Sequence, residues 1–381
     1  MKQLLARLFE PGSDHASAAA PLARPCVEAL EGRTLLHNPT ITSAIADNRG
    51  EAQIQFDLSS TELPTSQFNQ STVQMFKAGT DGQLGTSDDV HIAAVVSWVK
   101  ASARLIVRGA PGANVPYRIR IIASGISPDP GFKLDGEFNG TFPTGNGVAG
   151  GNFEMKVLPD TSTRPLVRMS TVFGTISLRM LRDIAPATVN NFFTYANAGN
   201  FDSIFFTRNV PNFIIQLGSL KVNSSNTVVN GPVRAPVVNE FHLSNTIGTV
   251  AMAKQGGNPN SATNQFFFNL ANNASNLDTQ NGGFTVFAQV ANASSLSVAK
   301  AVARREAVAL HNDVTGHGVL PSFPATGLTD TPVRSKNILT GTNEAIDQFG
   351  TQRFVVTGNF NATRDLILVR RTSVAGLIRA V

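Results

Sequence analysis

Residues 205–218 read Phe-Phe-Thr-Arg-Asn-Val-Pro-Asn-Phe-Ile-Ile-Gln-Leu-Gly. Apolar residues dominate on both sides of Arg208, as expected for two buried strands. By itself, an arginine at the end of an aromatic-rich strand is usually a solvated or ion-paired surface group. The role of Arg208 therefore has to be judged from the sequence around this stretch.

The surrounding region mixes strand-like and helix-like patterns. Residues 167–181 predict a strand, a turn and a second strand. Asp183 is placed to cap a helix, Pro186 suits its first turn, and Gly199 ends it. A second helix is expected at residues 296–310. Many short strands with only two helices are typical of a closed β-barrel capped by helices. The further strand-like runs are residues 203–207, 213–217, 248–253, 265–269 and 284–290.

Four blocks in this region, taken in order, resemble the cyclophilin-type peptidyl-prolyl cis-trans isomerases. Four blocks in register are far more specific than any one of them. The resemblance spans about residues 165–300 and implies a closing strand near Arg353–Val356. The blocks are Gly174-Thr175-Ile176 with residues 185–192 (Ala-Pro-Ala-Thr-Val-Asn-Asn-Phe), residues 205–218, residues 248–254 (Gly-Thr-Val-Ala-Met-Ala-Lys) with 260–267 (Asn-Ser-Ala-Thr-Asn-Gln-Phe-Phe), and residues 284–290 (Phe-Thr-Val-Phe-Ala-Gln-Val).

Prolyl isomerisation makes simple demands on a protein. Amide resonance opposes rotation with a barrier of ~18–20 kcal/mol, so uncatalysed exchange of an Xaa-Pro bond is slow. A catalyst breaks no covalent bond; it holds the proline ring in an apolar slot and favours the twisted amide. The imide nitrogen becomes basic when the amide twists, so a donor aimed at that nitrogen stabilises the transition state.

The resemblance implies that Arg208 is this donor, because a guanidinium stays charged and offers N–H groups in a fixed plane. A preorganised donor contributes a rate factor of ~10²–10³. The resemblance implies catalytic roles for Arg208, Phe213 and Gln216. It implies substrate-binding roles for Ile214, Met252, Ala253, Gln265, Phe267, Leu277 and Phe284.

Strand alternation supports part of this assignment independently of the resemblance. It places Gln265 and Phe267 on one face of a strand, with Phe266 and Phe268 on the other. Strict alternation does not place Phe213 and Gln216 on one face. A bulge or a strong twist is therefore expected there.

Several positions depart from the family pattern. Thr207 replaces a histidine before the arginine, and Phe284 replaces a histidine or tyrosine. Asn276 stands where many eukaryotic members carry tryptophan, which predicts weak cyclosporin binding. Lys254 stands where asparagine or arginine is common. The arginine, phenylalanines and glutamines are kept, so we expect an active isomerase that needs no cofactor.

Residues 47–158 show a period of two, typical of an antiparallel β-sandwich. Apolar Ile54 and Phe56, for example, alternate with Gln53 and Gln55. The stretch from Gln74 to Gly151 resembles bacterial immunoglobulin-like modules, with residues 78–90 as the recognisable piece. Residues 131–151 are rich in glycine and are expected to form the last loop and a linker.

An acidic loop in this sandwich is a weak candidate for a calcium site. Asp81, Asp88 and Asp89 supply the hard oxygen atoms that calcium prefers. Their spacing is not that of an EF-hand loop. A hairpin connection that uses glycine and aspartate for unusual dihedral angles explains the same residues. The sequence requires no metal.

Residues 1–46 are expected to be a leader or flexible arm. They lack the apolar stretch of a secretory signal. Residues 27–36 (Val-Glu-Ala-Leu-Glu-Gly-Arg-Thr-Leu-Leu) resemble an element near the start of large bacterial exported or surface proteins, although a short amphipathic helix is an alternative. With the immunoglobulin-like resemblance, this predicts an extracytoplasmic protein, either periplasmic or at the cell surface.

Composition excludes several classes of function. The 381 residues are 42% apolar and carry a net charge of only +5, which supports two or three packed domains. No window approaches the ~18 apolar residues of a membrane-spanning helix. No basic cluster predicts nucleic-acid binding. The single cysteine, Cys26, excludes an intrachain disulfide and a cysteine-based zinc site.

The sequence thus predicts a mainly β protein in four parts: a leader (1–46), an immunoglobulin-like β-sandwich with its linker (47–158), a cyclophilin-like barrel domain (164–360) and a C-terminal strand or tail (361–381). The expected function is isomerisation of Xaa-Pro bonds in proline-containing polypeptides by a monomer that assists protein folding. The alternative is a catalytically weak cyclophilin fold that binds proline-containing segments in a surface protein. A purely structural surface protein is the third interpretation.

Overall fold

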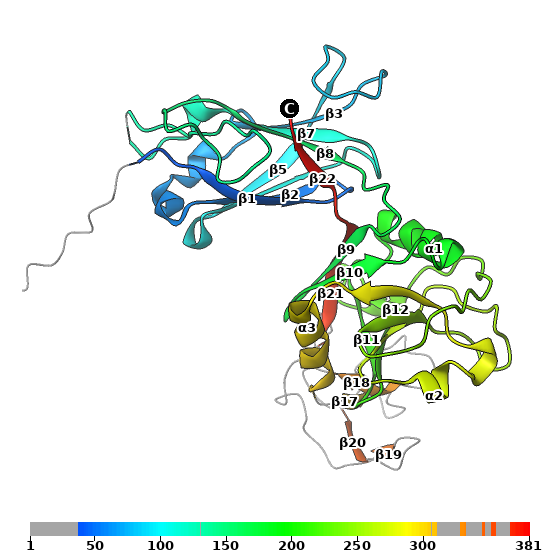
Figure 1. Ribbon diagram of the computed structural model, residues 1–381. Helices are drawn as coiled ribbons and strands as arrows, with labels where there is room; N and C mark the ends of the chain where they lie inside the picture. Colours follow the sequence, from blue (N-terminus) through cyan, green and yellow to red (C-terminus); the bar gives the residue numbers. More distant parts are fainter. Residues whose placement is uncertain are drawn as a thin grey trace, which may run out of the picture. The chain divides into compact units, whose positions relative to one another are not determined.

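The computed structural model describes residues 37–129, 131–305, 307–310, 328–332, 345–346, 352–355 and 366–381. The leader-like element at residues 27–36 lies outside them. In the described residues the chain forms a β-sandwich, blue to cyan in Figure 1, and a closed β-barrel, mainly green to yellow. Both predicted architectures are confirmed.

The β-sandwich packs two antiparallel sheets on one apolar core. Its alternating residues point inward, so that Ile54, Tyr117 and Phe153 are fully buried or nearly so. One sheet has the order β1 (Ile41–Ala46), β2 (Glu51–Phe56), β6 (Arg104–Gly109), β5 (Ala94–Val99). The other has the order β22 (Leu377–Ala380), β8 (Phe153–Leu158), β7 (Tyr117–Ile121), β3 (Val73–Lys77), β4 (Val90–Ile92).

The predicted boundary of the leader at residue 46 is wrong. Residues 41–46 form β1, which pairs with β2. Ile41 is completely buried in the core of the sandwich. The alternation in this short strand is weak, because its burial pattern has exposed residues at two adjacent positions. The period-two signal therefore becomes clear only at β2.

The β-barrel is a nine-stranded antiparallel sheet that closes on itself. Its strand β11 (Ile204–Val210) pairs with β21 (Leu368–Val374) on one side and with β12 (Ile214–Val222) on the other. This pairing removes the two open edges. The full order is β11, β21, β9 (Leu166–Thr171), β10 (Gly174–Met180), β16 (Val286–Val290), β14 (Thr249–Met252), β15 (Phe266–Asn269), β12 and the short β13 (Val228–Asn230).

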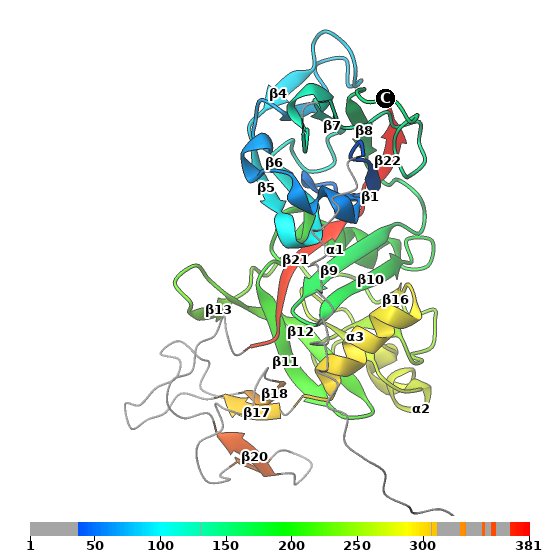
Figure 2. The ribbon, with the colours of Figure 1, turned by 90° about the vertical axis from the view of Figure 1, so that its left-hand side faces the viewer.

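Helices α1 (Pro186–Asn197) and α3 (Ala293–Ala303) cover different parts of the barrel. Helix α1 contacts β21 and β16, and α3 contacts β10, β12 and β16 (Figure 2). The predicted second helix ends earlier than expected, because residues 307–310 form strand β17. The remaining helical elements are α2 (Ala274–Leu277) and the 3-10 turns Leu58–Glu62, Thr65–Gln67, Lys100–Ser102, Ala123–Gly125 and Gln280–Gly282.

The predicted cap of α1 is also wrong. The N-cap is Ala185, which makes no side-chain cap, and Asp183 pairs instead with Arg164. The carboxylate of Glu240 accepts from the backbone N–H groups of Ala187 and Thr188 at 3.1 and 2.8 Å. A negative charge at this end satisfies the free donors and complements the helix dipole. The cap comes from far away in the sequence.

The strand that closes the barrel is not at residues 353–356. Strand β20 (Gln352–Val355) pairs with β17 (Ala307–Leu310) and β19 (Ala345–Ile346), in a separate sheet that also holds β18 (Leu328–Pro332). Strand β21 takes the closing position between β9 and β11. Residues 361–381, expected as a strand or tail, therefore contribute β21 to the barrel and β22 to the sandwich, where the C-terminus lies (Figure 1).

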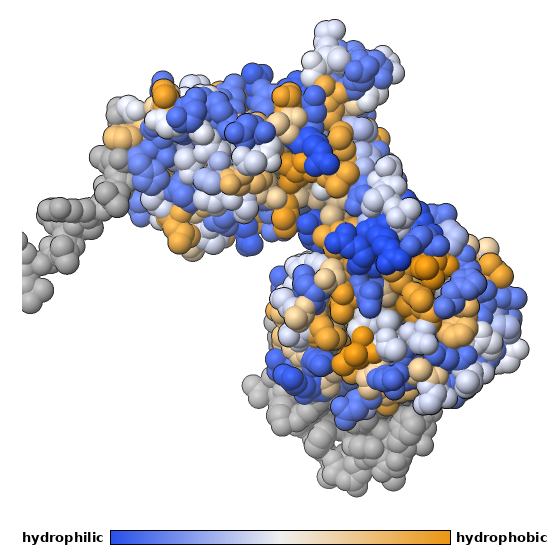
Figure 3. Space-filling view, in the orientation of Figure 1, coloured by the Kyte–Doolittle hydropathy of each residue, from blue (hydrophilic) through white to orange (hydrophobic). Residues whose placement is uncertain are grey.

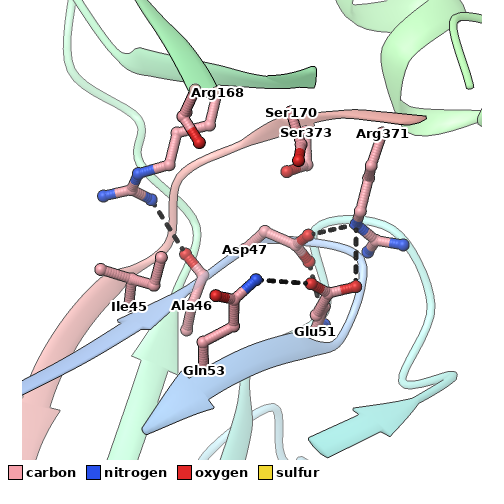
Figure 4. Close-up of a pocket in the computed structure, with 10 residues that line it drawn as sticks. Ile45, Ala46, Asp47, Glu51, Gln53, Arg168, Ser170, Arg371 and Ser373 are labelled. Atoms are coloured by element: carbon pink, nitrogen blue, oxygen red, sulfur yellow. Dashed lines mark hydrogen bonds and ion pairs between the residues drawn. The ribbon is translucent and has the colours of Figure 1, made fainter. Parts of the chain in front are cut away.

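Charged residues join β21 to the first hairpin of the sandwich. Arg371 donates from Nε to Asp47 at 2.7 Å and lies 3.6 Å from Glu51, beside a small hollow of about 80 Å³ (Figure 4). Arg49 binds both carboxylate oxygens of Asp202, at 3.0 and 2.6 Å. Arg371 lies in the middle of β21, so its ion pairs tie the closing strand to that hairpin.

In the part of the chain that the structure describes, no helix is long and apolar enough to cross a membrane. On the face shown in Figure 3, hydrophobic residues lie in small groups among hydrophilic ones. Exposed apolar side chains of this kind are normal for a protein surface.

Candidate active site

The hairpin formed by β11 and β12 places Arg208 directly opposite Gln216. The bulge expected between Phe213 and Gln216 is absent, because the pairing is regular from Ile214 to Gln216. The register shifts of this hairpin lie on the other side of Arg208, between Ile204 and Phe206 and between Phe206 and Arg208. Asn212 has a positive φ of 55°, and Phe213 N donates to Val210 O across the turn. Phe213 thus lies in the turn before β12 begins. For that reason alternation does not govern the direction of its side chain.

Arg208 is partly buried and has an unengaged side chain among the described residues. No hydrogen bond or ion pair joins its guanidinium to any of them. The residues beside it are anchored: the carbonyl of Thr207 accepts from Thr331 at 3.1 Å, and Asn209 Nδ2 donates to Ala303 O at 2.9 Å. The backbone of β11 is therefore held while the guanidinium remains available to a ligand.

Beside this hairpin lies an apolar cluster that is separate from the main core of the barrel. Among the residues predicted to bind substrate, Ile214, Phe267 and Leu277 are its buried members. Phe213, Ala253 and Phe284 pack against it and are partly exposed. The remaining members are Leu181, Ala251, Val286, Ile184 and Val210. The cluster provides the apolar surface that a proline ring requires.

Met252 is the predicted substrate-binding residue that the structure places elsewhere. Its side chain is 3% exposed and belongs to the main core of the barrel. The reason is alternation along β14, because Ala251 belongs to the apolar cluster and Ala253 packs against it. Met252 is therefore a packing residue.

Phe267 and Phe284 form one side of the cluster, with ring centroids 5.7 Å apart and planes at 71°. This edge-to-face geometry is a favourable one for two aromatic rings. The predicted alternation is confirmed: Phe267 belongs to the cluster, while Phe266 and Phe268 belong to the main core. Gln265 precedes β15, and its Oε1 accepts from Gln216 Nε2 at 2.9 Å.

A hollow of about 400 Å³ continues from this glutamine pair. Its walls are mostly uncharged polar groups, so it offers room for a polar part of a ligand beside the apolar cluster. The lining includes Gln216, Ser219, Ala253, Gln255, Thr263 and Gln265, together with one charged residue, Lys254.

A chain of buried asparagines links the walls of the cluster. Asn273 donates to the carbonyl of Phe213 at 2.9 Å and to Asn269 at 2.7 Å. Asn269 donates to Asn245 at 3.1 Å, and Asn245 donates to the carbonyl of Phe284 at 3.0 Å. Fully satisfied buried networks rigidify the groups that they join. The chain therefore fixes Phe213 and Phe284 relative to each other.

Sequence reasoning missed these asparagines and also Glu240. No local spacing marks them, because they come from different loops and strands. A signal existed only for Asn273, which directly precedes the short helix α2 and provides the carbonyl that accepts from Leu277 N. The partners of the others are set by the folded barrel.

Most carboxylate oxygens in the acidic loop of the sandwich accept hydrogen bonds from nearby groups, although the buried Oδ1 of Asp89 has no partner. Asp88 accepts from Thr86, from the backbone of Asp81 and from Thr80, and these bonds lower its pKa to about 2. Asp89 pairs with Arg118 at 2.8 Å. Across the described residues, no group of three or more histidine, cysteine, aspartate or glutamate side chains could hold a metal ion. Asp81, Asp88 and Asp89 lie in the loop that connects the paired strands β3 and β4.

Comparison with known proteins adds to this geometry. Residues 166–315 match the family model described as cyclophilin type peptidyl-prolyl cis-trans isomerase/CLD. The chain is 36% identical to the peptidyl-prolyl cis-trans isomerase of Acinetobacter baylyi over 126 residues, which are 33% of this chain and 65% of the relative. It is 35% identical to peptidyl-prolyl cis-trans isomerase B of Escherichia coli over 129 residues, which are 33% of this chain and 77% of the relative.

Peptidyl-prolyl cis-trans isomerase A of Dickeya dadantii is 36% identical over 132 residues, or 34% of this chain and 66% of the relative. The chain therefore spans just under two thirds of the Acinetobacter and Dickeya relatives. A solved cyclophilin type peptidyl-prolyl cis-trans isomerase from Cryptosporidium parvum aligns over 55% of this chain and 97% of its own, at 16% identity and a TM-score of 0.33. That structural likeness is too low to add to the sequence matches.

Proposed function

Because this chain belongs to the cyclophilin-type peptidyl-prolyl cis-trans isomerase family, we propose that it catalyses rotation about Xaa-Pro bonds in polypeptides. The observation that carries the proposal is an unengaged arginine on the hairpin that also contributes to an apolar cluster. Arg208 has no partner among the described residues, and Phe213 packs against the cluster on the same hairpin. The apolar cluster can pack against a proline ring, and the guanidinium can donate to the imide nitrogen of the same residue.

In this proposal the proline ring packs on Phe213, Phe267 and Leu277, and burial of that apolar surface supplies the binding free energy. The guanidinium of Arg208 donates to the imide nitrogen as the amide twists and its lone pair leaves conjugation. Gln216 lies opposite Arg208 and is oriented by Gln265, so it is placed to bind the peptide backbone. No covalent bond is made or broken, and no cofactor takes part.

The test is a protease-coupled assay on a proline-containing tetrapeptide with wild type and Arg208→Ala. We expect kcat/KM to fall by ~10²–10³-fold, because a preorganised donor to the transition state is lost. Arg304→Ala removes an exposed arginine at the end of α3 and serves as the matched control, with unchanged kcat/KM expected. Equal activity of wild type and Arg208→Ala would remove Arg208 from the mechanism.

The second candidate function is binding of proline-containing segments without efficient catalysis. The same apolar cluster and the hollow of about 400 Å³ would support it. Isothermal titration calorimetry measures binding of the tetrapeptide to the wild type, and together with the isomerisation assay it separates the two functions. Saturable binding with no acceleration of isomerisation would favour the binding module.

We also propose that the protein acts outside the cytoplasm as a monomer that assists protein folding. The likeness of residues 27–36 to an element of exported proteins supports this location, as does the likeness of residues 74–151 to immunoglobulin-like modules. Cell fractionation tests the location, and sedimentation of the purified chain tests the monomer. Accelerated refolding of a protein limited by prolyl isomerisation would support the folding role.

A further inference from the structure

The loop that carries Phe284 has an unusual backbone. Asn281, Gly282 and Gly283 have successive positive φ values of 51°, 75° and 74°. A Cβ at Gly283 would lie 2.4 Å from the ring of Phe241, so that position requires glycine. Glycine adopts positive φ readily, so Gly282 and Gly283 leave the backbone before Phe284 conformationally permissive, and Asn281 is the non-glycine residue of the three. The contacts that hold this loop therefore decide where Phe284 lies.

Lys254 supplies those contacts. Its Nζ donates to the carbonyl of Asn281 at 2.8 Å, to the carbonyl of Gly283 at 2.6 Å and to Asn239 Oδ1 at 3.2 Å. An ammonium group has three N–H donors, so all of them are engaged. Two of the three acceptors belong to the left-handed segment itself.

The same ammonium group also lies 5.0 Å from the centre of the Phe284 ring, at cation–π distance. Among the described residues no carboxylate forms an ion pair with Lys254. Burial lowers its pKa, with no compensating carboxylate. Its partners are therefore backbone carbonyls, an amide oxygen and an aromatic face, all of which hold the Phe284 loop.

We propose that Lys254 is a positioning residue, which fixes the Phe284 wall of the proline slot through the carbonyls of Asn281 and Gly283. Lys254 also lines the hollow of about 400 Å³, but its three donors are engaged by protein groups and not free for a ligand. Lys254 lies directly after Ala253, which packs against the apolar cluster, so it connects that strand end to the loop. The expected effect of Lys254 on substrate binding rests on the proposed isomerase function. Its expected effect on the structure of the Phe284 loop is independent of that function.

The first measurement is amide hydrogen exchange, followed by mass spectrometry, in the full chain. Lys254→Met keeps the apolar stem and removes the ammonium. We expect faster exchange in residues 278–285 and unchanged exchange in β9 and β10. Lys254→Arg keeps a charge and several donors, and it should restore most of the protection. Lys133→Met, an exposed lysine of the sandwich, is the matched control and should change neither region.

The second measurement is the kinetics of the same variants on the tetrapeptide. A displaced Phe284 weakens binding of the ring in the ground state and transition state alike, so Lys254→Met should raise KM about tenfold and leave kcat within about twofold. Lys254→Arg should recover most of the affinity.

The two measurements separate the two proposals. If the wild type does not catalyse isomerisation, the proposed function fails, and the exchange of residues 278–285 alone decides the role of Lys254. Unchanged exchange in Lys254→Met would overturn that role. A fall in kcat at constant KM would also overturn it, because the ammonium would then act on the transition state.

Discussion

Arg208 differs from the two arginines that tie the sandwich hairpin to the barrel, because those two form ion pairs. Arg371 binds Asp47, and Arg49 binds Asp202, so these guanidinium groups are structural. No described residue binds the side chain of Arg208, whose hairpin contributes Val210, Phe213 and Ile214 to the apolar cluster. None of the Arg208 nitrogens is among the buried side-chain atoms that lack a hydrogen-bond partner, so its N–H donors are accessible to a ligand. A ligand that accepts from it would therefore be bound favourably.

Tyr117 provides a pH-dependent prediction at the same scale. Its hydroxyl donates to the carbonyl of Asp47 at 2.8 Å in the interior, and burial raises its pKa well above the ordinary value. The folded form keeps tyrosine neutral while the unfolded chain ionises above about pH 10, so stability is full below that pH and falls above it. We expect the free energy of unfolding of the sandwich to decline steeply above about pH 10.

Trp98 is the only tryptophan and lies in the core of the sandwich, so its fluorescence follows the unfolding of that part. Urea titrations at a series of alkaline pH values measure the decline. Tyr117→Phe should be less stable at neutral pH by about 1 kcal/mol, because the hydrogen bond is lost, and should show a shallower alkaline decline. If the free energies of unfolding of wild type and Tyr117→Phe fell equally with pH, Tyr117 would not be the group responsible for the alkaline decline.

At the scale of elements, strand periodicity correctly predicted the direction of side chains where each face of a strand packs against a different apolar core. Phe266, Phe267 and Phe268 alternate between the two cores as predicted. Helix ends were less predictable, because α1 is capped by Glu240 and not by the nearby Asp183. Alternation is a property of the local backbone, whereas a cap is any group that the fold brings to the helix end.

Glu240 should therefore stabilise α1, although it lies far from that helix in the sequence. Glu240→Ala removes the acceptor for two backbone N–H groups, so we expect the free energy of opening of the first turn to fall by ~0.5–2 kcal/mol. Native-state hydrogen exchange of residues 187–193 measures it. Asp183→Asn is the control: this exposed carboxylate pairs with Arg164, and its loss should matter much less. A larger effect at Asp183 would restore it as the cap.

For the whole molecule, the most consequential feature is the path of the last residues. Strand β21 completes the barrel between β9 and β11, and β22 then extends the second sheet of the sandwich beside β8. The region that matches the isomerase family ends at residue 315, well before this closing strand. The barrel therefore depends on a segment about fifty residues beyond the matched region.

Two deletions test this dependence. Removing residues 366–381 leaves β9 and β11 without their shared partner, so we expect the barrel to lose amide protection and cooperative unfolding. Removing only residues 377–381 deletes β22 and should expose the amides of β8 while the barrel stays protected. Hydrogen exchange measures both. A protected barrel in the longer deletion would show that β21 is dispensable.

The sequence alone determined the two β architectures, the hairpin that carries Arg208 and most of the apolar cluster, because periodicity and family motifs are local properties of the chain. The tertiary structure decided which strand closes the barrel, what caps α1, where Met252 points and how Lys254 and the asparagines hold the slot. Each of these depends on which distant segments meet, and neither spacing nor composition encodes the partner of a side chain. The motif around Arg208 can be recognised in the sequence, but only the folded chain shows that none of the described residues binds its guanidinium.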